Sequence, residues 1–159
     1  MKTLKNSTLF YLFVLLISVQ FATAQKLVTA AEVTPALLKE TCDNAYIEII
    51  EVKDTYIKIK NTYNVYLDID SSKRFVTFSS VYNLVEGASK KDALELVNKL
   101  NAEVALIKTY YSESTNTITY FYYFWTEGGF TQKSLISSLR LYKTALDLSL
   151  DKDTGKLIK

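Results

Sequence analysis

Residues 104–125 read VALIKTYY-SEST-NTITYFYYFW, which is two β-rich runs separated by a short polar segment. We predict strands over residues 104–111 and 116–125, joined by a hairpin loop over residues 112–115. Residues 120–125 are all aromatic. Because side chains alternate between the two faces of a strand, the second run presents aromatic groups on both faces. It is therefore expected to be covered on both sides or to lie centrally in a sheet.

The two faces of this run carry different side chains: Phe121, Tyr123 and Trp125 share one, and Tyr120, Tyr122 and Phe124 share the other. We expect the first set to meet the core, because two of its three members lack a hydroxyl that would need a partner. The expected core partners are Leu94, Val97, Leu100 and Leu139. Thr115, Thr117 and Thr119 weaken this choice, and Ile118 favours the reverse.

If Phe121, Tyr123 and Trp125 meet the core, the face with Tyr120, Tyr122 and Phe124 is free to contact a partner. Its aromatic side chains are then candidate binding residues. Aromatic residues with polar tips are enriched where proteins bind proteins, although core packing is the alternative use for them. A fourth candidate, Tyr66, lies in the run Tyr63–Ile69, where Val65, Leu67 and Ile69 point to the opposite side. The candidate partner-binding residues are Tyr120, Tyr122, Phe124 and Tyr66.

The chain before this hairpin has the same period of two. Four runs are predicted as strands of an antiparallel meander, separated by turn-forming residues: residues 46–52, 55–60, 63–69 and 75–82. Three segments have helical spacing and begin at Thr34-Pro35, Ser89 and Thr131, residues that cap helices: residues 35–44, 90–102 and 132–150. We predict an α+β fold, a twisted antiparallel sheet of about five to six strands flanked by three helices.

The N-terminus predicts export. Lys2 and Lys5 precede an apolar run over residues 9–19, and Ala22-Thr23-Ala24 has the small-x-small pattern of a signal-peptidase site. The apolar run is short for a membrane anchor, which needs about 20 residues. We predict a signal peptide over residues 1–24, a flexible lead-in over 25–33, one domain over 34–150 and a frayed polar tail over 151–159. The mature protein is expected in the periplasm, cell envelope or medium, without stable membrane insertion.

Composition argues against several functions. Without Lys2 and Lys5, the 19 basic residues fall to 17, which equals the number of acidic ones. A mature chain with no net charge does not favour nucleic acid as a partner. The sequence contains no histidine and a single cysteine, Cys42. Because histidine is the commonest general base and metal ligand, we predict no enzymatic activity, no metal site and no cofactor. Cys42 is expected to be buried; a thiol that cross-links two chains is the alternative.

Three further motifs have a plain structural interpretation beside a functional one. Asp151-Lys152-Asp153-Thr154-Gly155 resembles the start of a calcium loop, but the sequence lacks the glutamate at position twelve that such a loop needs. Asp68 and Asp70 share a strand face, as paired catalytic carboxylates do, yet they adjoin Lys73 and Arg74 and are expected to be a solvated strand end. Asn98 and Asn101 lie on a helix and are expected to tie it to the sheet or the following turn.

These strands and helices resemble the YbjN-like family of bacterial sensory transduction regulators. The resemblance spans about residues 34–150 and is carried by Tyr63-Asn64-Val65-Tyr66-Leu67, Phe75-Val76-Thr77-Phe78, Leu96-Val97-Asn98-Lys99-Leu100-Asn101, the 118–125 strand and Gly128-Gly129. The family is similar in fold to type III secretion chaperones, which bind extended segments of client proteins. The resemblance thus implies such a fold and a protein or peptide client.

We therefore expect a non-enzymatic, exported interaction module with a chaperone-like or adaptor-like role, and a homodimer is compatible with it. The alternative is a small-molecule or lipid binder with an apolar cavity between sheet and helices. Retained lipid would favour the second function, and a large apolar surface patch or a symmetric dimer would favour the first.

Overall fold

The structure is a computed structural model that describes residues 26–159, so the predicted signal peptide lies outside the described residues. Its elements follow the order η1 (Ala30–Glu32), α2 (Pro35–Asn44), β1 (Glu48–Val52), β2 (Tyr56–Asn61), β3 (Tyr63–Ile69), β4 (Phe75–Asn83), α3 (Lys90–Glu103), β5 (Lys108–Ser112), β6 (Thr117–Trp125) and α4 (Gln132–Asp151). Among these residues no helix is both long and apolar enough to cross a membrane.

The six strands form one antiparallel sheet in the order β1-β2-β3-β4-β6-β5. β1 to β4 form a meander, and the β5–β6 hairpin joins it through β6. The β4–β6 pair is the longest, with a register that runs from Phe75↔Trp125 to Asn83↔Thr117. The predicted α+β fold is confirmed, and the aromatic strand β6 lies inside the sheet rather than at an edge.

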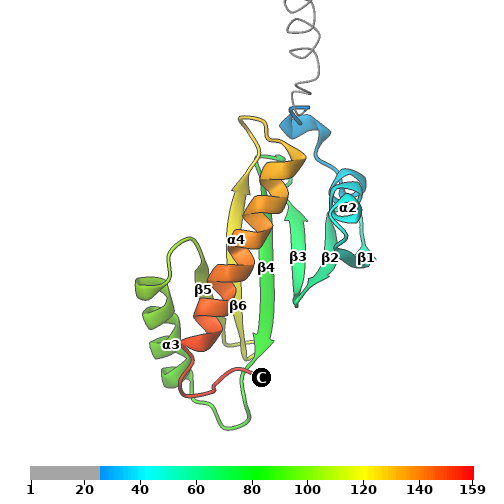
Figure 1. The fold of residues 1–159 in the computed structure, drawn as a ribbon. Coiled ribbons are helices and arrows are strands. Elements are labelled where there is room, and N and C mark those ends of the chain that lie inside the picture. The colour runs from blue at the N-terminus through cyan, green and yellow to red at the C-terminus, as the bar shows by residue number, and fades with distance from the viewer. Residues whose placement is uncertain (1–25) are drawn as a thin grey trace, which may run out of the picture.

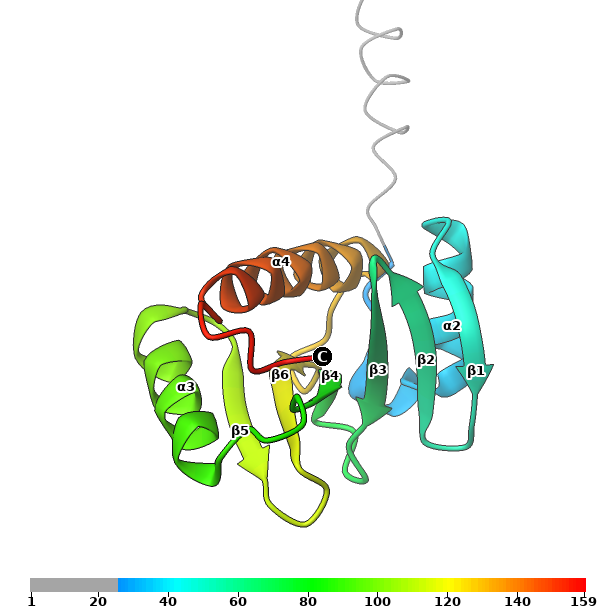
Figure 2. The ribbon, with the colours of Figure 1, turned by 90° about the horizontal axis from the view of Figure 1, so that it is seen from below.

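The helices are distributed unevenly around this sheet. α2 and α4 lie on the same face, and α3 packs beside β5 at one edge (Figures 1 and 2). The predicted hydroxyl caps are present, since Thr34, Ser89 and Thr131 accept hydrogen bonds from the N–H groups of Leu37, Asp92 and Ser134. No described helix covers the opposite face of the sheet.

The hydrophobic core lies between the sheet and this helix layer. In the middle of the sheet, Phe78 is fully buried and its ring contacts the rings of Tyr122, Phe124 and Tyr142. The Tyr142 hydroxyl of α4 donates a hydrogen bond of 3.1 Å to the Tyr120 carbonyl oxygen of β6. Burial of these side chains is the main stabilising term of the fold, since each large apolar side chain contributes about 1.5–3 kcal/mol when fully buried.

Asn101 joins α3 to the outer edge of β5. Its side-chain amide donates to the Thr109 carbonyl oxygen at 2.8 Å, and its side-chain oxygen accepts from the Thr109 N–H at 2.9 Å. The amide thereby pairs with β5 as the backbone of a neighbouring strand would. The prediction that an asparagine ties this helix to the sheet is confirmed for Asn101, whereas the Asn98 side chain is exposed.

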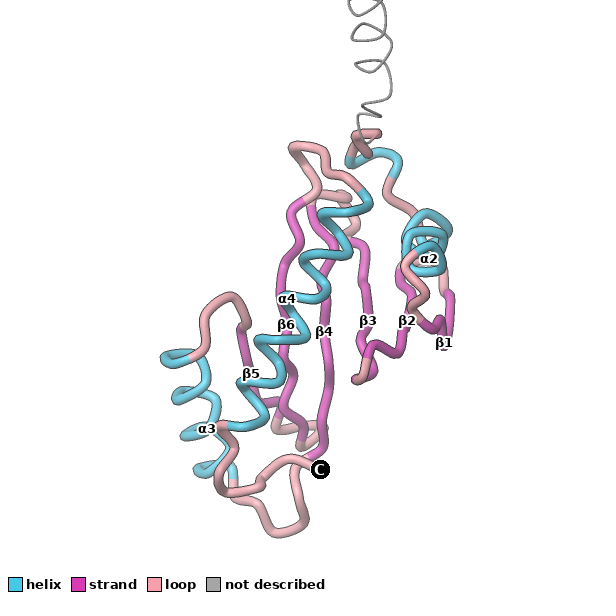
Figure 3. The backbone as a smooth tube through the Cα atoms, in the orientation of Figure 1, coloured by secondary structure: helices cyan, strands magenta, loops and turns pink. Residues whose placement is uncertain are grey.

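Both ends of the described chain are more ordered than the sequence suggested. In the segment predicted as a flexible lead-in, Val28 and Val33 are buried, and Val28 exchanges backbone hydrogen bonds with Phe130. In the segment predicted as a frayed tail, the Lys159 N–H donates to Asn83 and the Val85 N–H donates to Leu157. These residues close against the end of β4 (Figure 3). Apolar Leu157 and Ile158, which pack on the core, explain the difference.

Two local predictions need correction. β5 begins at Lys108 and not at Val104, because residues 104–107 form the connection from α3 and Leu106 has a positive φ of 70°. A residue in that conformation cannot continue a strand. Leu94, expected in the core, is exposed, while Ala93, Leu96, Val97 and Leu100 form the buried side of α3.

Candidate functional site: the open face of the sheet

The sheet face that carries no described helix is the candidate site, and we call it the open face. Strand registers place its side chains in cross-strand rows. One row crosses five strands, from Lys58 through Tyr66, Ser79 and Phe121 to Lys108. The neighbouring row contains Tyr56, Asp68, Thr77 and Tyr123, and a third consists of Phe75 and Trp125.

Aromatic rings follow one another across three strands of the open face. Ring centroids are 5.8 Å apart for Tyr110 and Phe121, 5.3 Å for Phe121 and Tyr123, 4.9 Å for Tyr123 and Phe75, and 6.4 Å for Phe75 and Trp125. Such contacts stabilise each ring pair by about 0.5–1.5 kcal/mol and hold the rings in place. The open face therefore presents a preorganised aromatic surface on β5, β6 and β4.

Much of this aromatic surface remains in contact with solvent. Tyr110, Tyr123 and Trp125 keep 50%, 52% and 53% of their surface accessible. Large aromatic side chains are costly to leave half-exposed, and clusters of them mark sites that bind another molecule. The Tyr hydroxyls and the Trp125 indole N–H also supply hydrogen-bonding groups, which suits a partner with both apolar and polar atoms.

Cationic side chains flank the aromatic surface. The Arg74 guanidinium lies 5.2 Å from the centre of the Trp125 ring, and the Lys58 ammonium lies 4.9 Å from the centre of the Tyr66 ring. Arg74 is also paired with Glu127 at 3.4 Å. Tyr66 contacts Tyr56 at 5.7 Å, so the second aromatic pair of this face lies on β2 and β3.

The carboxylate of Asp68 lies in the middle of the open face between Tyr56 and Thr77. Partial burial raises the pKa of the Asp68 carboxyl above its usual value. Asp70, its predicted neighbour, instead accepts a hydrogen bond from the Ser72 N–H and its pKa is lowered, first by the Ser72 hydroxyl. The two carboxylates thus belong to different environments. No cluster of metal-ligating side chains is present among residues 26–159.

The sequence-based assignment of the two β6 faces is wrong. Tyr120 and Phe124 are buried under α4 and Tyr122 packs against the same core, so these three candidates lie on the helix-covered face. Phe121, Tyr123 and Trp125, expected in the core, lie on the open face. Tyr66 was placed correctly on the outward side of β3 and remains a candidate.

The correct choice of the buried face of β6 depends on the side chains of the whole strand and not on the six aromatic residues alone. Ile118 shares the Tyr120 face and is fully buried, and it pairs with Tyr82 of β4 on the core side. The absence of a hydroxyl was a weak criterion, because Tyr120 is fully buried even though its hydroxyl has no hydrogen-bond partner among the described residues. Phe75 and Tyr110 were missed altogether; the alternation of Val76 and Phe78 with Phe75 was the available signal.

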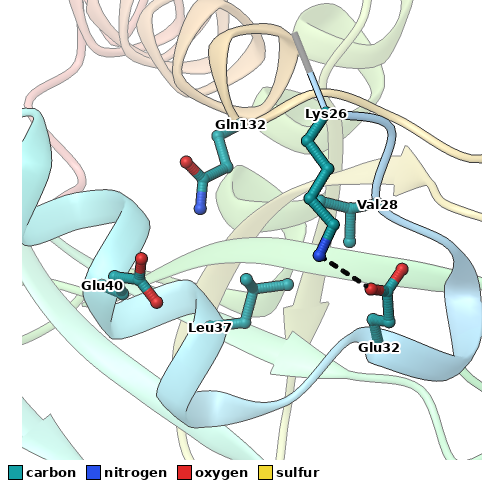
Figure 4. Close-up of a pocket in the computed structure, with 6 residues that line it drawn as sticks. All are labelled: Lys26, Val28, Glu32, Leu37, Glu40 and Gln132. Atoms are coloured by element: carbon teal, nitrogen blue, oxygen red, sulfur yellow. Dashed lines mark ion pairs between the residues drawn. The ribbon is translucent and has the colours of Figure 1, made fainter.

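A separate cavity of about 350 Å³ opens where the lead-in, α2 and the start of α4 meet (Figure 4). Four of the six residues that line it are polar or charged: Lys26, Val28, Glu32, Leu37, Glu40 and Gln132. Lys26 Nζ and Glu32 Oε1 lie 3.2 Å apart. Hydrogen bonds from Thr29 and the Lys26 charge lower the pKa of Glu32 to about 2. We interpret these interactions as contacts that hold the lead-in, residues 26–33, in its folded conformation.

Cys42 lies on the buried side of α2, where burial raises the pKa of its thiol to about 12. A thiol with so high a pKa is not a nucleophile near neutral pH. Its buried position agrees with the first of the two sequence-based interpretations.

Comparison with known proteins identifies the family. The sequence profile of the YbjN family, described as "Putative bacterial sensory transduction regulator", matches residues 51–152. The fold is similar to the crystal structure of YbjN from E. coli, described as "a putative transcription regulator": the TM-score is 0.66 at 13% identity, over 78% of this chain and 94% of that one. No curated protein matches the chain. The matched profile covers most of the domain, and the chain therefore belongs to the YbjN family.

Proposed function

We propose that this protein is a non-enzymatic interaction module that binds a protein or peptide segment on the open face. Membership of a family of regulators supports a regulatory or adaptor-like role. The observation that carries the finer proposal is the half-exposed aromatic surface of Tyr110, Tyr123 and Trp125. Aromatic side chains of this kind are enriched at the centres of protein interfaces.

The chemistry of the chain supports binding rather than catalysis. The sequence has no histidine, the commonest general base, and the cross-strand neighbours of the Asp68 carboxylate on the open face are Tyr56 and Thr77. A polypeptide suits the open face because it combines apolar side chains, which pack on rings, with backbone groups that bond to Tyr hydroxyls, Ser79 and Thr77. A mature chain without net charge disfavours nucleic acid.

The binding surface is tested by capture experiments with matched variants. Mature protein, wild type or variant, is immobilised and exposed to envelope extract, and retained proteins are identified by mass spectrometry. Trp125→Ala and Tyr123→Ala are expected to reduce capture of a specific partner at least about tenfold, the effect of losing an interface hot spot. Leu148→Ala removes an equally exposed side chain from α4 and is the control. Capture that survives both aromatic changes contradicts the proposal.

We further propose that the protein acts outside the cytoplasm, after removal of residues 1–24. Ala22 and Ala24 suit signal peptidase, and Lys2 and Lys5 precede the apolar run. Protein recovered from the envelope or the medium is expected to begin at Gln25 on N-terminal sequencing. Recovery of an envelope form that still begins at Met1 contradicts cleavage.

A further inference from the structure

The two edge strands of the sheet, β5 and β1, differ in whether their outward backbone groups have hydrogen-bond partners. At the β5 edge the Asn101 amide occupies the Thr109 N–H and C=O groups, and α3 stands beside the strand. At the other edge β2 is the only strand that pairs with β1 among residues 26–159, and α2 lies over the sheet face rather than beside the edge (Figure 2). An uncovered edge strand presents unpaired backbone groups to another chain.

The exposed side of β1 is also apolar. Ile50 and Val52 keep 44% and 43% of their surface accessible, and Tyr46, just before the strand, keeps 99%. The Lys53 N–H donates to the Tyr56 carbonyl oxygen of β2 at 2.9 Å. Because backbone groups alternate in direction along an antiparallel strand, the N–H and C=O of Val52 point away from β2, toward the free edge.

We propose that β1 pairs antiparallel with β1 of a second copy of this chain, with Glu48 opposite Lys53. The two-fold symmetry of such a contact forms each opposing pair twice. Two Glu48–Lys53 ion pairs then flank two Ile49–Val52 contacts, and Ile50 lies opposite Glu51. The edge is thus complementary in charge and in apolar character to itself, which is what selects a second copy over an unrelated strand.

The bulge in β1 determines this register. The pairing with β2 shifts between Ile49 and Glu51, so Ile50 is the extra residue of a β-bulge. Ile49 and Val52 pair with Ile59 and Ile57, whose side chains are buried under the helices. Glu48 and Glu51 pair with Lys60 and Lys58, on the open-face side. Lys53 lies on that side too, since its Nζ is 3.0 Å from Glu51 Oε1.

Residues directly opposite in a pair of strands must point to the same face. The Glu48–Lys53 register satisfies this rule without placing like charges together, and it pairs the whole of β1. A register centred on Val52 also sets opposite charges together, Glu51 against Lys53, but it places Ile50 against Asp54 of the β1–β2 turn and leaves much of β1 outside the contact. A register centred on Ile50 sets Glu48 against Val52, which point to opposite faces. A register that sets Glu48 against Glu51 matches the faces but creates two repulsive pairs.

The paired edges join two six-stranded sheets into one. The two-fold axis is perpendicular to the sheet at β1, so both open faces lie on the same side of the dimer. Tyr46 comes beside the β1–β2 turn of the second copy. The contact is shorter than standard interfaces of roughly 1,200–2,000 Å², so the dimer is expected to depend on protein concentration.

Charge reversal tests the register in the full mature chain. In sedimentation velocity over the micromolar range, wild type is expected to shift from monomer to dimer. Glu48→Lys and Lys53→Glu are each expected to weaken the dimer about tenfold, because each replaces two attractive pairs by two repulsive ones. The double variant Glu48→Lys/Lys53→Glu restores the pairs and the dimer. Lys91→Glu, on an exposed α3 ion pair, is a control without effect.

Cysteine trapping provides an independent readout. Residues 48 and 53 of one chain are roughly 16 Å apart along the strand, too far for a disulfide, whereas Glu48 and Lys53 of two copies lie directly opposite. Glu48→Cys/Lys53→Cys is expected to give a cross-linked dimer under mild oxidation, and either single variant is not. Buried Cys42 does not interfere. A monomeric wild type at every concentration, or a dimer that neither charge reversal weakens, overturns the proposal.

Discussion

The two faces of this sheet are both rich in aromatic residues, yet they differ in their exposure to solvent. On the covered face, Phe78 and Tyr120 are fully buried and pack against α4. On the open face, Tyr123 and Trp125 come from the same strand as Tyr120 and remain half-exposed. Aromatic content therefore does not distinguish a buried face from a solvent-exposed one. What distinguishes them is whether a helix layer removes the rings from water, which is the term that stabilises the fold.

The largest expected effect compares two tyrosines of β6. Tyr120→Ala is expected to destabilise the domain by about 3–5 kcal/mol, since it leaves a large cavity in the core. Tyr123→Ala removes a half-exposed ring and is expected to cost about 1–2 kcal/mol. Urea denaturation of the two variants measures both values. Equal losses would show that the open face is as buried in solution as the covered one.

An intermediate effect is expected at the edge beside α3. Asn101→Ala leaves the Thr109 N–H and C=O without their partner and is expected to cost about 1–3 kcal/mol. Asn98→Ala is the matched control, because the same change at an exposed position of the same helix removes no hydrogen bond to the sheet and improves helix propensity. Thermal melts compare the two. If Asn98→Ala is the more damaging change, the edge is not closed by Asn101.

The smallest effect concerns the carboxylate of the open face. Partial burial raises the pKa of Asp68, so the folded state holds its proton more tightly than the unfolded state. Stability from this group is therefore gained as pH falls through the raised pKa, and the ionised form is unfavourable above it. Asp68→Asn is expected to be slightly more stable than wild type at pH 7.

This advantage of Asp68→Asn is expected to disappear below the unfolded-state pKa of about 3.9. Urea denaturation as a function of pH follows the difference, and partner capture by the variant is expected to stay near wild type. A variant that is less stable than wild type at pH 7 and equal to it in acid would contradict a raised pKa. Loss of partner capture by a well-folded Asp68→Asn protein would show that this carboxylate takes part in binding on the open face.

The local features of this fold were readable from the sequence. The period of two predicted the strands of the meander and the β5–β6 hairpin, and Thr34, Ser89 and Thr131 marked the helix starts because their hydroxyls satisfy free N–H groups. The single buried cysteine and the helix–sheet role of an asparagine were also predicted. Each of these depends on neighbours a few residues away, which a sequence displays directly.

The candidate site could be predicted only in part. The aromatic strand was recognised as the important one, and Tyr66 was placed on the outward side, but the choice between the two faces of β6 was wrong. That choice depends on which face of the sheet α4 covers. The contact that decides it joins Tyr142 of α4 to Tyr120 of β6, which are 22 residues apart in the sequence. Phe75 and Tyr110 join the site only because β4 and β5 both pair with β6.

The sequence by itself determined the alternation of the strands, the starts of the helices and the absence of histidine. Only the tertiary structure decided which aromatic face stays in water, which sheet edge is closed, and that the lead-in and tail are packed. The reason is physical: periodicity and capping are local, whereas burial depends on which distant segments come together. Two isolated β-bridges, between Val28 and Phe130 and between Leu84 and Ile158, are contacts of this kind. Neither can be inferred from the residues that are adjacent in the sequence.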